Sequence, residues 1–296
     1  MPNHWSARRK ELPPDFGASA TVGDRHETGL GVVGYNVGLS YDQGWRVKRG
    51  VNRVFGVGTD GALEPIVDYR TNLTRRNVDV SGLVSFGYEP VKGQELAVTT
   101  LLVRTSEDET ELYEGNLSND DREIRVTSLN WVEEQLLSTQ LRGKHELVNG
   151  IVLSWSYAYA LATREQPDFR RTRYDFDPNV NAYLLSNRPE GNQRLYNEVE
   201  DDNHDLSLSL DVPFTVWKKL TAHVQGGGGY VLRDRESETR RFKFIHRGEQ
   251  SRDPAVLVLE PEQAFSTQFI SPDGFSFEEI TRATDCLLYT SDAADE

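Results

Sequence analysis

The residue groups in this chain that most resemble catalytic or metal-binding motifs are all incomplete. His26-Glu27 and His145-Glu146 lack the second histidine that a zinc-protease helix places three residues after the glutamate. Asp175 and Asp177 begin like a calcium loop, but the glycine at its sixth position and the acid at its twelfth are missing. Gly226–Gly229 is followed by strand-forming residues, so no helix terminus is there to bind a phosphate. We therefore expect no enzyme, with no catalytic residue, no cofactor and no metal site.

Arginines in one long polar segment are the best candidates for contacting a ligand. The segment runs from Arg164 to His204 and mixes these arginines with several acids. Guanidinium groups bind phosphate and carboxylate groups through paired hydrogen bonds. The residues that we expect to contact an anionic ligand or lipopolysaccharide are Arg170, Arg171, Arg173 and Arg188. A solvated loop surface is the alternative interpretation of the same residues.

Composition excludes two classes of protein. The formal net charge is −14, and the pI near 5.0 argues against nucleic acid as a partner. Mean hydropathy is −0.59, and no run approaches the roughly 20 apolar residues that a membrane-spanning helix needs. A membrane β-barrel passes this test, because only alternate residues of its strands face lipid.

Apolar side chains recur at every second residue in four parts of the chain. Large apolar residues alternate there with small or polar ones in Gly31–Tyr41, Asn77–Tyr88, Gly150–Thr163 and Asp205–Phe214. A period of two indicates β-strands with one apolar face. The opposite face is too small and polar to fill the core of a soluble protein, whereas it suits a barrel with lipid outside and a polar lumen inside.

The lengths of the connections predict how these strands are arranged. The strands that we expect are Gly31–Tyr41, Trp45–Val57, Asn77–Tyr88, Glu95–Arg104, Arg122–Leu147, Gly150–Thr163, Asp205–Phe214, Leu220–Arg233 and possibly a ninth near Arg240–His246. The short connections are Asp42–Gly44, Glu89–Gln94, Val148–Gly150 and Pro213–Lys219. The long polar ones are Thr59–Arg76, Thr105–Asp121, Arg164–His204 and the segment from Asp234 onward. Alternating short turns and long loops is typical of an antiparallel up-and-down transmembrane β-barrel whose long loops lie outside the cell. With eight or nine strands we expect an incomplete barrel, an open curved sheet.

The second expected strand carries charges that do not fit the middle of a membrane. Arg49 and Arg53 share a face with Trp45, and a basic residue at mid-bilayer costs roughly 2–4 kcal/mol. Either a bulge shifts the register there, or this stretch quickly rises beyond the membrane.

Aromatic residues flank three of the four short connections. The residues concerned are Tyr41, Trp45, Tyr88, Phe214 and Trp217. Amphipathic rings favour the membrane–water boundary, so we expect these turns to lie at the periplasmic girdle. Ordinary packing beside the turns of a soluble protein is the alternative.

Both ends of the chain are unusual for a protein of the outer membrane. Met1–Gly17 has no apolar core for a signal peptide, so we expect the natural start to lie upstream. Cys286–Glu296 resembles an in-frame translation of a transposase-type sequencing adapter, and we expect it to be foreign to the protein. Residues 1–285 would then be one partial barrel without any cysteine, which removes thiol and disulfide chemistry.

Several segments resemble the barrel of TonB-dependent outer-membrane receptors. They are Leu129–His145, Pro167–Arg170, Arg233–Phe242 and Ser271–Asp285. The resemblance implies active transport of a large nutrient, such as an iron chelate, cobalamin or a glycan, across the outer membrane of a Gram-negative-type cell. Complete receptors have an N-terminal plug, a motif that engages TonB and a barrel of about twenty-two strands. This chain shows neither plug nor TonB motif, so the resemblance implies a middle part of a receptor that would reach TonB only through its missing N-terminal region.

Two other classes of protein remain open. A passive porin or structural barrel would need no plug, and a soluble all-β protein, such as a surface lectin, would need no membrane. The upstream coding sequence distinguishes them, because a plug indicates transport, a signal peptide alone indicates a porin, and neither indicates a soluble protein. In the first two cases the partners would be outer-membrane lipid and lipopolysaccharide.

Overall fold

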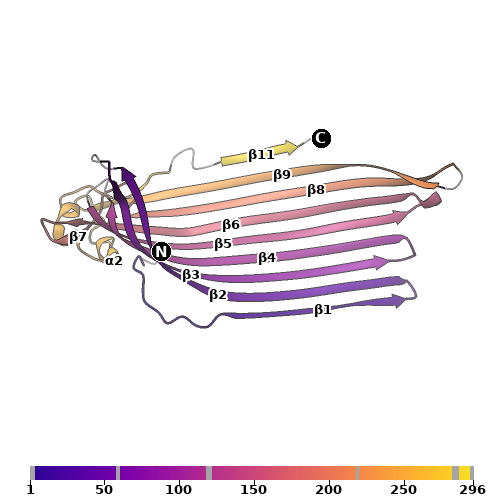
Figure 1. Ribbon diagram of the computed structural model, residues 1–296, viewed down its shortest axis with the longest axis horizontal. Helices are drawn as coiled ribbons and strands as arrows, with labels where there is room; N and C mark the ends of the chain where they lie inside the picture. The colour runs from indigo at the N-terminus through magenta and orange to yellow at the C-terminus, as the bar shows by residue number, and fades with distance from the viewer. Residues whose placement is uncertain (1–3, 58–60, 118–121, 218–219, 282–286, 294–296) are drawn as a thin grey trace.

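A computed structural model describes residues 4–57, 61–117, 122–217, 220–281 and 287–293. One antiparallel sheet dominates it, with strands in the order β1-β2-β3-β4-β5-β6-β8-β9-β10 (Figure 1). The strands are β1 (Phe16–Thr28), β2 (Gly31–Val57), β3 (Leu63–Glu89), β4 (Gln94–Leu117), β5 (Arg122–Glu146), β6 (Val152–Asp177), β7 (Ala182–Leu185), β8 (Gln193–Val216), β9 (Leu220–His246), β10 (Phe275–Glu279) and β11 (Leu287–Ala293). Short helices are η2 (Val148–Gly150), η3 (Gln250–Arg252), α1 (Pro254–Leu257) and α2 (Pro261–Ala264).

The sheet is open and runs up and down, which confirms the all-β fold class. The neighbouring long strands pair antiparallel from β1 to β9, and β1 and β9 are not paired with each other. Off this path, β7 pairs with β6 and β11 pairs with β9. The strand β11 lies within the segment expected to derive from an adapter, whereas Cys286 lies outside the described residues.

The expected turn at Asp42–Gly44 is wrong. The 27-residue strand β2 passes through it without a break, so Gly31–Tyr41 and Trp45–Val57 belong to one strand. Asp42 pairs with Gly17 of β1 on one side and with Asp79 of β3 on the other. The backbone groups of this turn-like sequence are therefore satisfied by two neighbouring strands.

The first hairpin instead joins β2 to a strand that sequence analysis missed. That strand is β1, and it turns into β2 at Gly29 and Leu30. Gly31 has φ +121°, a backbone conformation that favours glycine, and a Cβ there would lie 2.3 Å from the carbonyl oxygen of Glu89. Tyr41 and Trp45 consequently lie far along β2 from this turn, and their expected position beside a turn is wrong.

The short connections expected at Glu89–Gln94 and Val148–Gly150 are confirmed. The one expected at Pro213–Lys219 joins β8 to β9, but β8 continues to Val216, and residues 218–219 lie outside the described residues. The strand ends at these connections lie with the β1–β2 turn at one end of the sheet (Figure 1). Most of the expected long loops are strand instead, because β3, β4, β6, β8 and β9 extend far into them. In these extensions opposite charges pair across strands, as Arg75 does with Glu107 and Glu109. A polar segment can therefore remain in the ladder where its neighbour supplies complementary charges.

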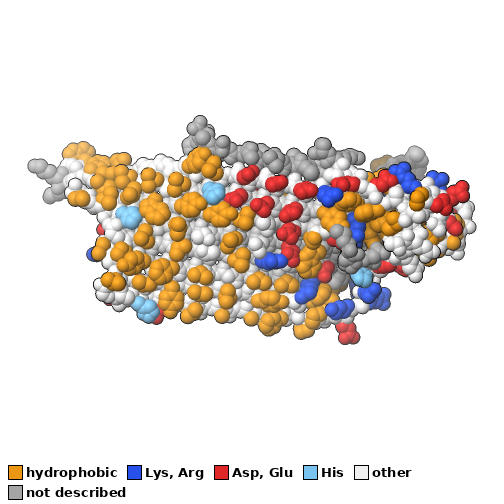
Figure 2. All heavy atoms as spheres, turned by 180° about the vertical axis from the view of Figure 1, so that it is seen from behind, with side chains coloured by type: hydrophobic (Ala, Val, Ile, Leu, Met, Phe, Trp, Pro, Cys, Tyr) orange, Lys and Arg blue, Asp and Glu red, His pale blue; other side chains and the backbone are white. Residues whose placement is uncertain are grey.

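The two faces of the long strands have different compositions near the short turns. One face, called here the apolar face, exposes large side chains such as Leu39 (64%), Phe86 (44%) and Leu208 (54%). Figure 2 shows hydrophobic side chains gathered over the part of the sheet near the short turns, with acidic side chains beyond them. The opposite face, called here the polar face, carries small and polar residues, for example Gly87, Ala160 and Ser207.

The hydrophobic core lies at the other end of the sheet. Its largest member is Trp5, which is 1% exposed and packs edge-on against Phe244 and Phe265. The amides of Trp5 and Ser6 both donate to Oε1 of Glu262 at 2.7 Å. The N-terminal segment is thereby bound to the β9–β10 connection. The remaining buried members of this end cluster are Leu185, Val256, Leu257, Ala264 and Phe275.

Replacing Trp5 tests this end cluster. Trp5→Ala removes a large buried ring, so we expect the opening free energy of the cluster to fall by about 3–5 kcal/mol. Amide hydrogen exchange at Leu257 and Phe265 measures the change. The control is Leu12→Ala in the same segment, where the side chain is 40% exposed and little change is expected. Unchanged exchange in Trp5→Ala would refute a stabilising role for Trp5.

Candidate functional site

The β6–β8 connection forms a folded hairpin over the far end of the sheet. Its short strand β7 pairs with the end of β6, from Tyr174 opposite Leu185 to Asp177 opposite Ala182. Asn192 closes the connection in the left-handed region with φ 57°, which asparagine tolerates better than most residues. This hairpin brings residues distant in sequence against the ends of β6 and β9.

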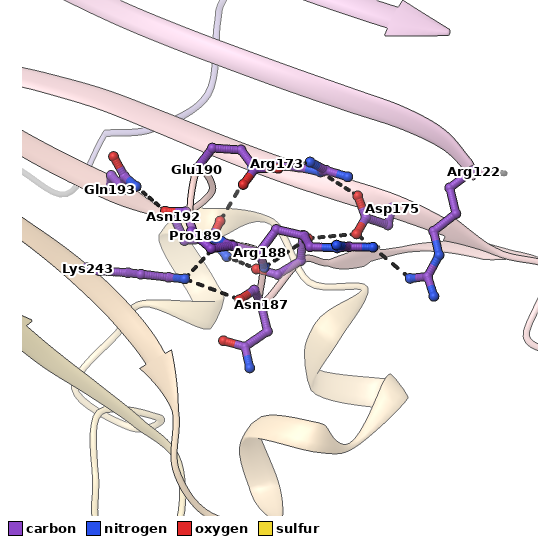
Figure 3. A network of polar contacts seen from close by, with 11 residues as sticks. Arg122, Arg173, Asp175, Asn187, Arg188, Pro189, Glu190, Asn192, Gln193 and Lys243 are labelled. Atoms are coloured by element: carbon purple, nitrogen blue, oxygen red, sulfur yellow. Dashed lines mark hydrogen bonds and ion pairs between the residues drawn. The ribbon is translucent and has the colours of Figure 1, made fainter. Parts of the chain in front are cut away.

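A buried polar network holds this hairpin in place (Figure 3). The Arg173 side chain is 3% exposed, and its Nε donates to Oδ1 of Asp175 at 2.6 Å. Its Nη1 also contacts the carboxylate of Glu190. Oδ2 of Asp175 accepts from the Ser186 hydroxyl at 2.6 Å, and Asn192 donates to the Ser186 carbonyl at 2.6 Å. The buried guanidinium therefore has both the countercharge and the hydrogen bonds that burial of a charge requires.

Lys243 connects the same network to β9. Its Nζ donates to the carbonyl oxygens of Asn187 at 3.1 Å and Arg188 at 2.7 Å. Burial lowers the pKa of Lys243, while the negative charge of Glu190 partly opposes that shift. The amide of Phe244 donates to the Asn192 carbonyl at 3.0 Å. The hairpin is thus fastened to β9 as well as to β6.

A hollow of about 640 Å³ adjoins the network. Arg122, Asp175, His246 and Arg252 are among its lining residues. Burial lowers the pKa of His246, and the positive charges of Lys243 and Arg252 lower it further, against a hydrogen bond with Ser251. The hollow carries both arginine and aspartate side chains, because Asp175 and Asp177 line it beside Arg122 and Arg252, so its lining is polar with charges of both signs.

The arginines singled out from the sequence are divided between the two faces. Arg171 and Arg173 lie two residues apart on the polar face, and Arg188 follows in the hairpin. Arg171 donates from Nε to the Ser128 hydroxyl at 3.1 Å. Arg170 faces the opposite side, where it pairs with Asp168 and lies 5.9 Å from the Trp5 ring centre. The structure therefore does not gather all four into one site, and their contact with a ligand stays a prediction.

Arg170 belongs instead to a second cluster, around Asp168. Arg194 is largely buried and donates from Nε and Nη2 to the two oxygens of Asp168 at 2.9 and 2.6 Å. Burial acts to raise the pKa of Asp168, but the hydrogen bonds from Arg170 and Arg194 outweigh it and lower the pKa. Both arginines also lie over the Trp5 ring. This cluster joins the end of the sheet to the hydrophobic end cluster.

Sequence reasoning missed the partners of these arginines. The sequence places Asp168 and Glu190 among the acids of a long polar segment, and nothing in it singles out Arg194 or Lys243. The four residues come from β6, the β7–β8 connection, β8 and β9, so no local spacing connects them. The asparagine in Gly191-Asn192 was the one local signal, because such a pair is typical of a turn.

Comparison with known proteins adds no relative. No family model, curated protein or solved structure matches the chain. Within the described ranges, no helix is long and apolar enough to span a membrane. Across those same ranges, no three His, Cys, Asp or Glu side chains are grouped so that they could hold a metal ion.

Removing the Arg173 charge tests whether the network holds the hairpin. In Arg173→Met the carboxylates of Asp175 and Glu190 lose their main cation, so we expect opening to cost about 3 kcal/mol less. That change corresponds to roughly 100-fold faster amide exchange at Ser186 and Phe244. Arg171→Met is the matched control, two residues away on the same face, and should leave both amides unchanged. Equal exchange in the two variants would show that Arg173 does not hold the hairpin.

Proposed function

We propose that this sheet is part of the membrane-spanning wall of an outer-membrane transport barrel of the TonB-dependent receptor class. The observation that carries the proposal is the broad apolar face exposed across all the long strands. A water-soluble monomer rarely exposes a continuous apolar patch of more than a few hundred Å². The lectin-like alternative would leave this face in water without a partner.

The height of the apolar face is close to that of a bilayer. In β8 the face extends from Leu206 to Phe214, about 27 Å along the strand at a rise of about 3.4 Å per residue, which is about 20 Å along the membrane normal at typical barrel tilt. The apolar band of outer-membrane barrels is about 25 Å tall. Pairing continues it sideways, with Leu206 opposite Tyr157 of β6 and Tyr230 of β9. The band is therefore a property of the whole sheet rather than of one strand.

Aromatic and charged residues mark the limit of this band away from the short turns. One row of paired residues crosses β2 to β5 as Trp45, Arg76, Asp108 and Trp131. Arg76 lies 5.6 Å from the Trp45 ring centre and donates to Gln43 at 2.6 Å. Tryptophan favours the membrane interface, and charged groups are costly within hydrocarbon. Trp45 thus supports the membrane boundary far from the short turns, whereas the sequence predicted that it lies at the periplasmic boundary beside a short turn.

On the remaining strands the band ends at carboxylates. Asp202 and Asp234 face each other across β8 and β9, followed by Glu200 opposite Glu236. Tyr88, Phe214 and Trp217 lie near the short turns at the other limit. Arg49 lies on β2 beyond Trp45, in agreement with the second explanation offered for its charge, a rise beyond the membrane. The other explanation was a bulge that shifts the register near Arg49 and Arg53. The register shift between β2 and β3 lies further along β2, between Val54 and Phe55.

The polar face supports a receptor in particular. Within the band it carries small residues in neighbouring strands, and these are Gly34, Gly38, Ser85, Gly87, Ala97, Ala158, Ala160, Ser207, Gly227 and Gly229. Such a wall leaves room for a second body, such as a plug, inside the barrel. Together with the resemblance of its segments to TonB-dependent receptors, this favours active uptake over the passive porin. The same proposal includes the uptake of a large nutrient, such as an iron chelate, cobalamin or a glycan, and contact with TonB.

A lysine substitution on each face tests the membrane-spanning part of the proposal. Leu208→Lys places a charge in mid-band, and we expect insertion into lipid vesicles to become less favourable by about 2–4 kcal/mol. Ser209→Lys is the matched control, because the next residue faces the polar side. Folding of the full chain into vesicles, followed by protease protection, measures insertion. Equal insertion of both variants would exclude lipid contact at Leu208.

The coding sequence upstream of Met1 tests the transport part. If the proposal is correct, it encodes a signal peptide, a TonB-engaging motif and a plug domain before the sheet begins. A signal peptide without a plug would favour the passive porin. Absence of both from the complete gene would reject both membrane alternatives.

A further inference from the structure

A hollow lies beside the bulge of β6, at the far end of the sheet. The pairing of β6 with β8 shifts between Gln166 and Phe169, and Pro167 in this gap has no partner in β5 or β8. A proline suits such a position because it has no amide hydrogen to donate to a ladder. The hollow has a volume of about 540 Å³, and Pro167 is part of its lining. Tyr196 and Glu198 of β8 also line it, at positions that alternate onto the apolar-face side of the sheet.

Three aromatic rings form the apolar part of this hollow. The Tyr196 ring meets the Phe242 ring edge-on, with ring centres 5.7 Å apart, and Phe242 stacks on Phe277 at 5.1 Å. Phe277 also packs on Phe244 of the end cluster, with ring centres 4.7 Å apart. It is nevertheless 41% exposed. The hollow therefore offers an ordered apolar surface against which a ligand can bury an apolar side chain.

Carboxylates surround these rings. Glu165, Glu198 and Glu238 line the hollow, and Glu198 is directly opposite Glu165 on one side and Glu238 on the other. Among the described residues, none of the three has a lysine, arginine or histidine within ion-pair distance. Like charges directly opposite each other on neighbouring strands are destabilising, so a cation placed between them is favoured.

The arginine in the lining does not balance these carboxylates. Arg240 donates from Nε and Nη2 to the two carboxylate oxygens of Glu279, at 3.1 and 3.0 Å. These hydrogen bonds with Glu279 are the main cause that raises the pKa of Arg240, and the charge of Glu238 adds a weaker effect of the same sign. One guanidinium is thus shared among more carboxylates than it can neutralise, and the hollow keeps a negative charge.

The negative charge continues from the hollow toward the apolar band. Pairs of carboxylates, called here the acidic rows, cross β8 and β9 at every second residue, namely Glu198 with Glu238, Glu200 with Glu236 and Asp202 with Asp234. Figure 2 shows acidic side chains gathered beyond the apolar region. Successive rows are about 7 Å apart along the strands, and alternate side chains of an extended peptide have the same spacing. A peptide with a basic residue at every second position therefore matches the acidic rows.

The charge of the acidic rows is least balanced near the hollow. In the row nearest the band, Asp202 accepts a hydrogen bond from the Tyr159 hydroxyl at 3.3 Å, and its Oδ1 lies 3.4 Å from Nε2 of His204. Tyr196 lies six residues beyond Asp202, about 20 Å along β8 at about 3.4 Å per residue. The hollow is thus well outside the apolar band, where a partner in solution can reach it.

We propose that the hollow and the acidic rows bind a basic segment of a partner polypeptide in extended conformation. An apolar side chain of the segment packs against Phe277 and the neighbouring rings. Lysine or arginine side chains at alternate positions pair with the acidic rows, beginning with Glu198 and Glu238. The complementary charge identifies the partner, because an acidic or neutral segment would leave the facing carboxylates unbalanced. This binding does not depend on whether the apolar face spans a membrane.

Binding of short labelled peptides to the full chain, folded in a neutral detergent, tests the proposal. The first peptide alternates lysine with leucine, the second glutamate with leucine, and the third lysine with serine. Ca²⁺ is added as a competitor. The variant Glu198→Gln with Glu238→Gln removes two facing carboxylates of the hollow. Glu27→Gln with Glu64→Gln is the matched control, because it removes the same charge from exposed positions of β1 and β3.

We expect the lysine–leucine peptide to bind about tenfold or more tightly than either of the other two peptides, and high salt to weaken its binding. The Glu198→Gln with Glu238→Gln variant should lose about tenfold in affinity for it, whereas the control variant should lose nothing. Amide hydrogen exchange at Phe265 should be the same in all variants, which shows that the end cluster next to the hollow still folds.

Four results contradict the proposal. Absence of binding of the lysine–leucine peptide to the unmodified chain rejects it outright. Equal affinity for the lysine–serine peptide excludes the aromatic hollow as an anchor, and equal losses in the two double variants show attraction by net charge alone. Displacement of the peptide by Ca²⁺ at an ionic strength where Na⁺ does not displace it assigns the carboxylates to a metal ion instead. Each of these results leaves the proposed membrane function untouched, because insertion is measured separately with Leu208→Lys.

Discussion

The hydrogen-bond ladder between the long strands is the constraint on which the other features depend. Once the register is fixed, each residue is assigned to one of two faces, and a slip by one residue would move every side chain of the apolar face to the polar side. The register irregularities lie between Val54 and Phe55, between Leu129 and Glu133, and between Gln166 and Phe169. All three lie at or beyond the boundary of the apolar band. The ladder is therefore regular within the apolar band, where a bilayer would require it. Among the described strands it is irregular only in the strand extensions on the other side of the boundary, near the long connections.

The way in which side chains are covered changes along the long strands. Near the short turns, the apolar face is exposed, and no other described segment of the chain covers it. Beyond the boundary, charges are balanced across strands, as by Arg233 with Asp201, and connections supply the remaining cover. In the part of the chain that the structure describes, the hydrophobic core around Trp5 lies there. The molecule thus has its internal core outside the region that we assign to the membrane, where water makes such a core stabilising.

Alternation in the sequence predicted the apolar face correctly because a period of two is a local property. Asp42–Gly44 misled because its residues are typical of turns, and only the nonlocal partners in β1 and β3 keep them extended. The charged extensions were mistaken for loops for the same reason. At the candidate site, the extra residue of β6 between Gln166 and Phe169 reverses the alternation before Arg170. Alternation alone separates Arg170 from Arg171 and Arg173 once the segment is known to be a strand, but the bulge decides which face each arginine takes. No composition reveals such a bulge, so neither these faces nor the carboxylate partners of the arginines could be foreseen.

The edges of the sheet connect the fold to the proposed function. β9 is paired on its outer side by β11 along Val231–Ser237 and by β10 along Phe242–His246. Its segment Leu220–Tyr230, which lies within the apolar band, has no outer partner among the described strands, and neither does β1. An unpaired backbone group facing hydrocarbon costs several kcal/mol. If the sheet enters a bilayer, each uncovered edge adds this cost, so strands that pair with the edges, whether they belong to a larger barrel or to a neighbouring copy of the sheet, would make insertion more favourable.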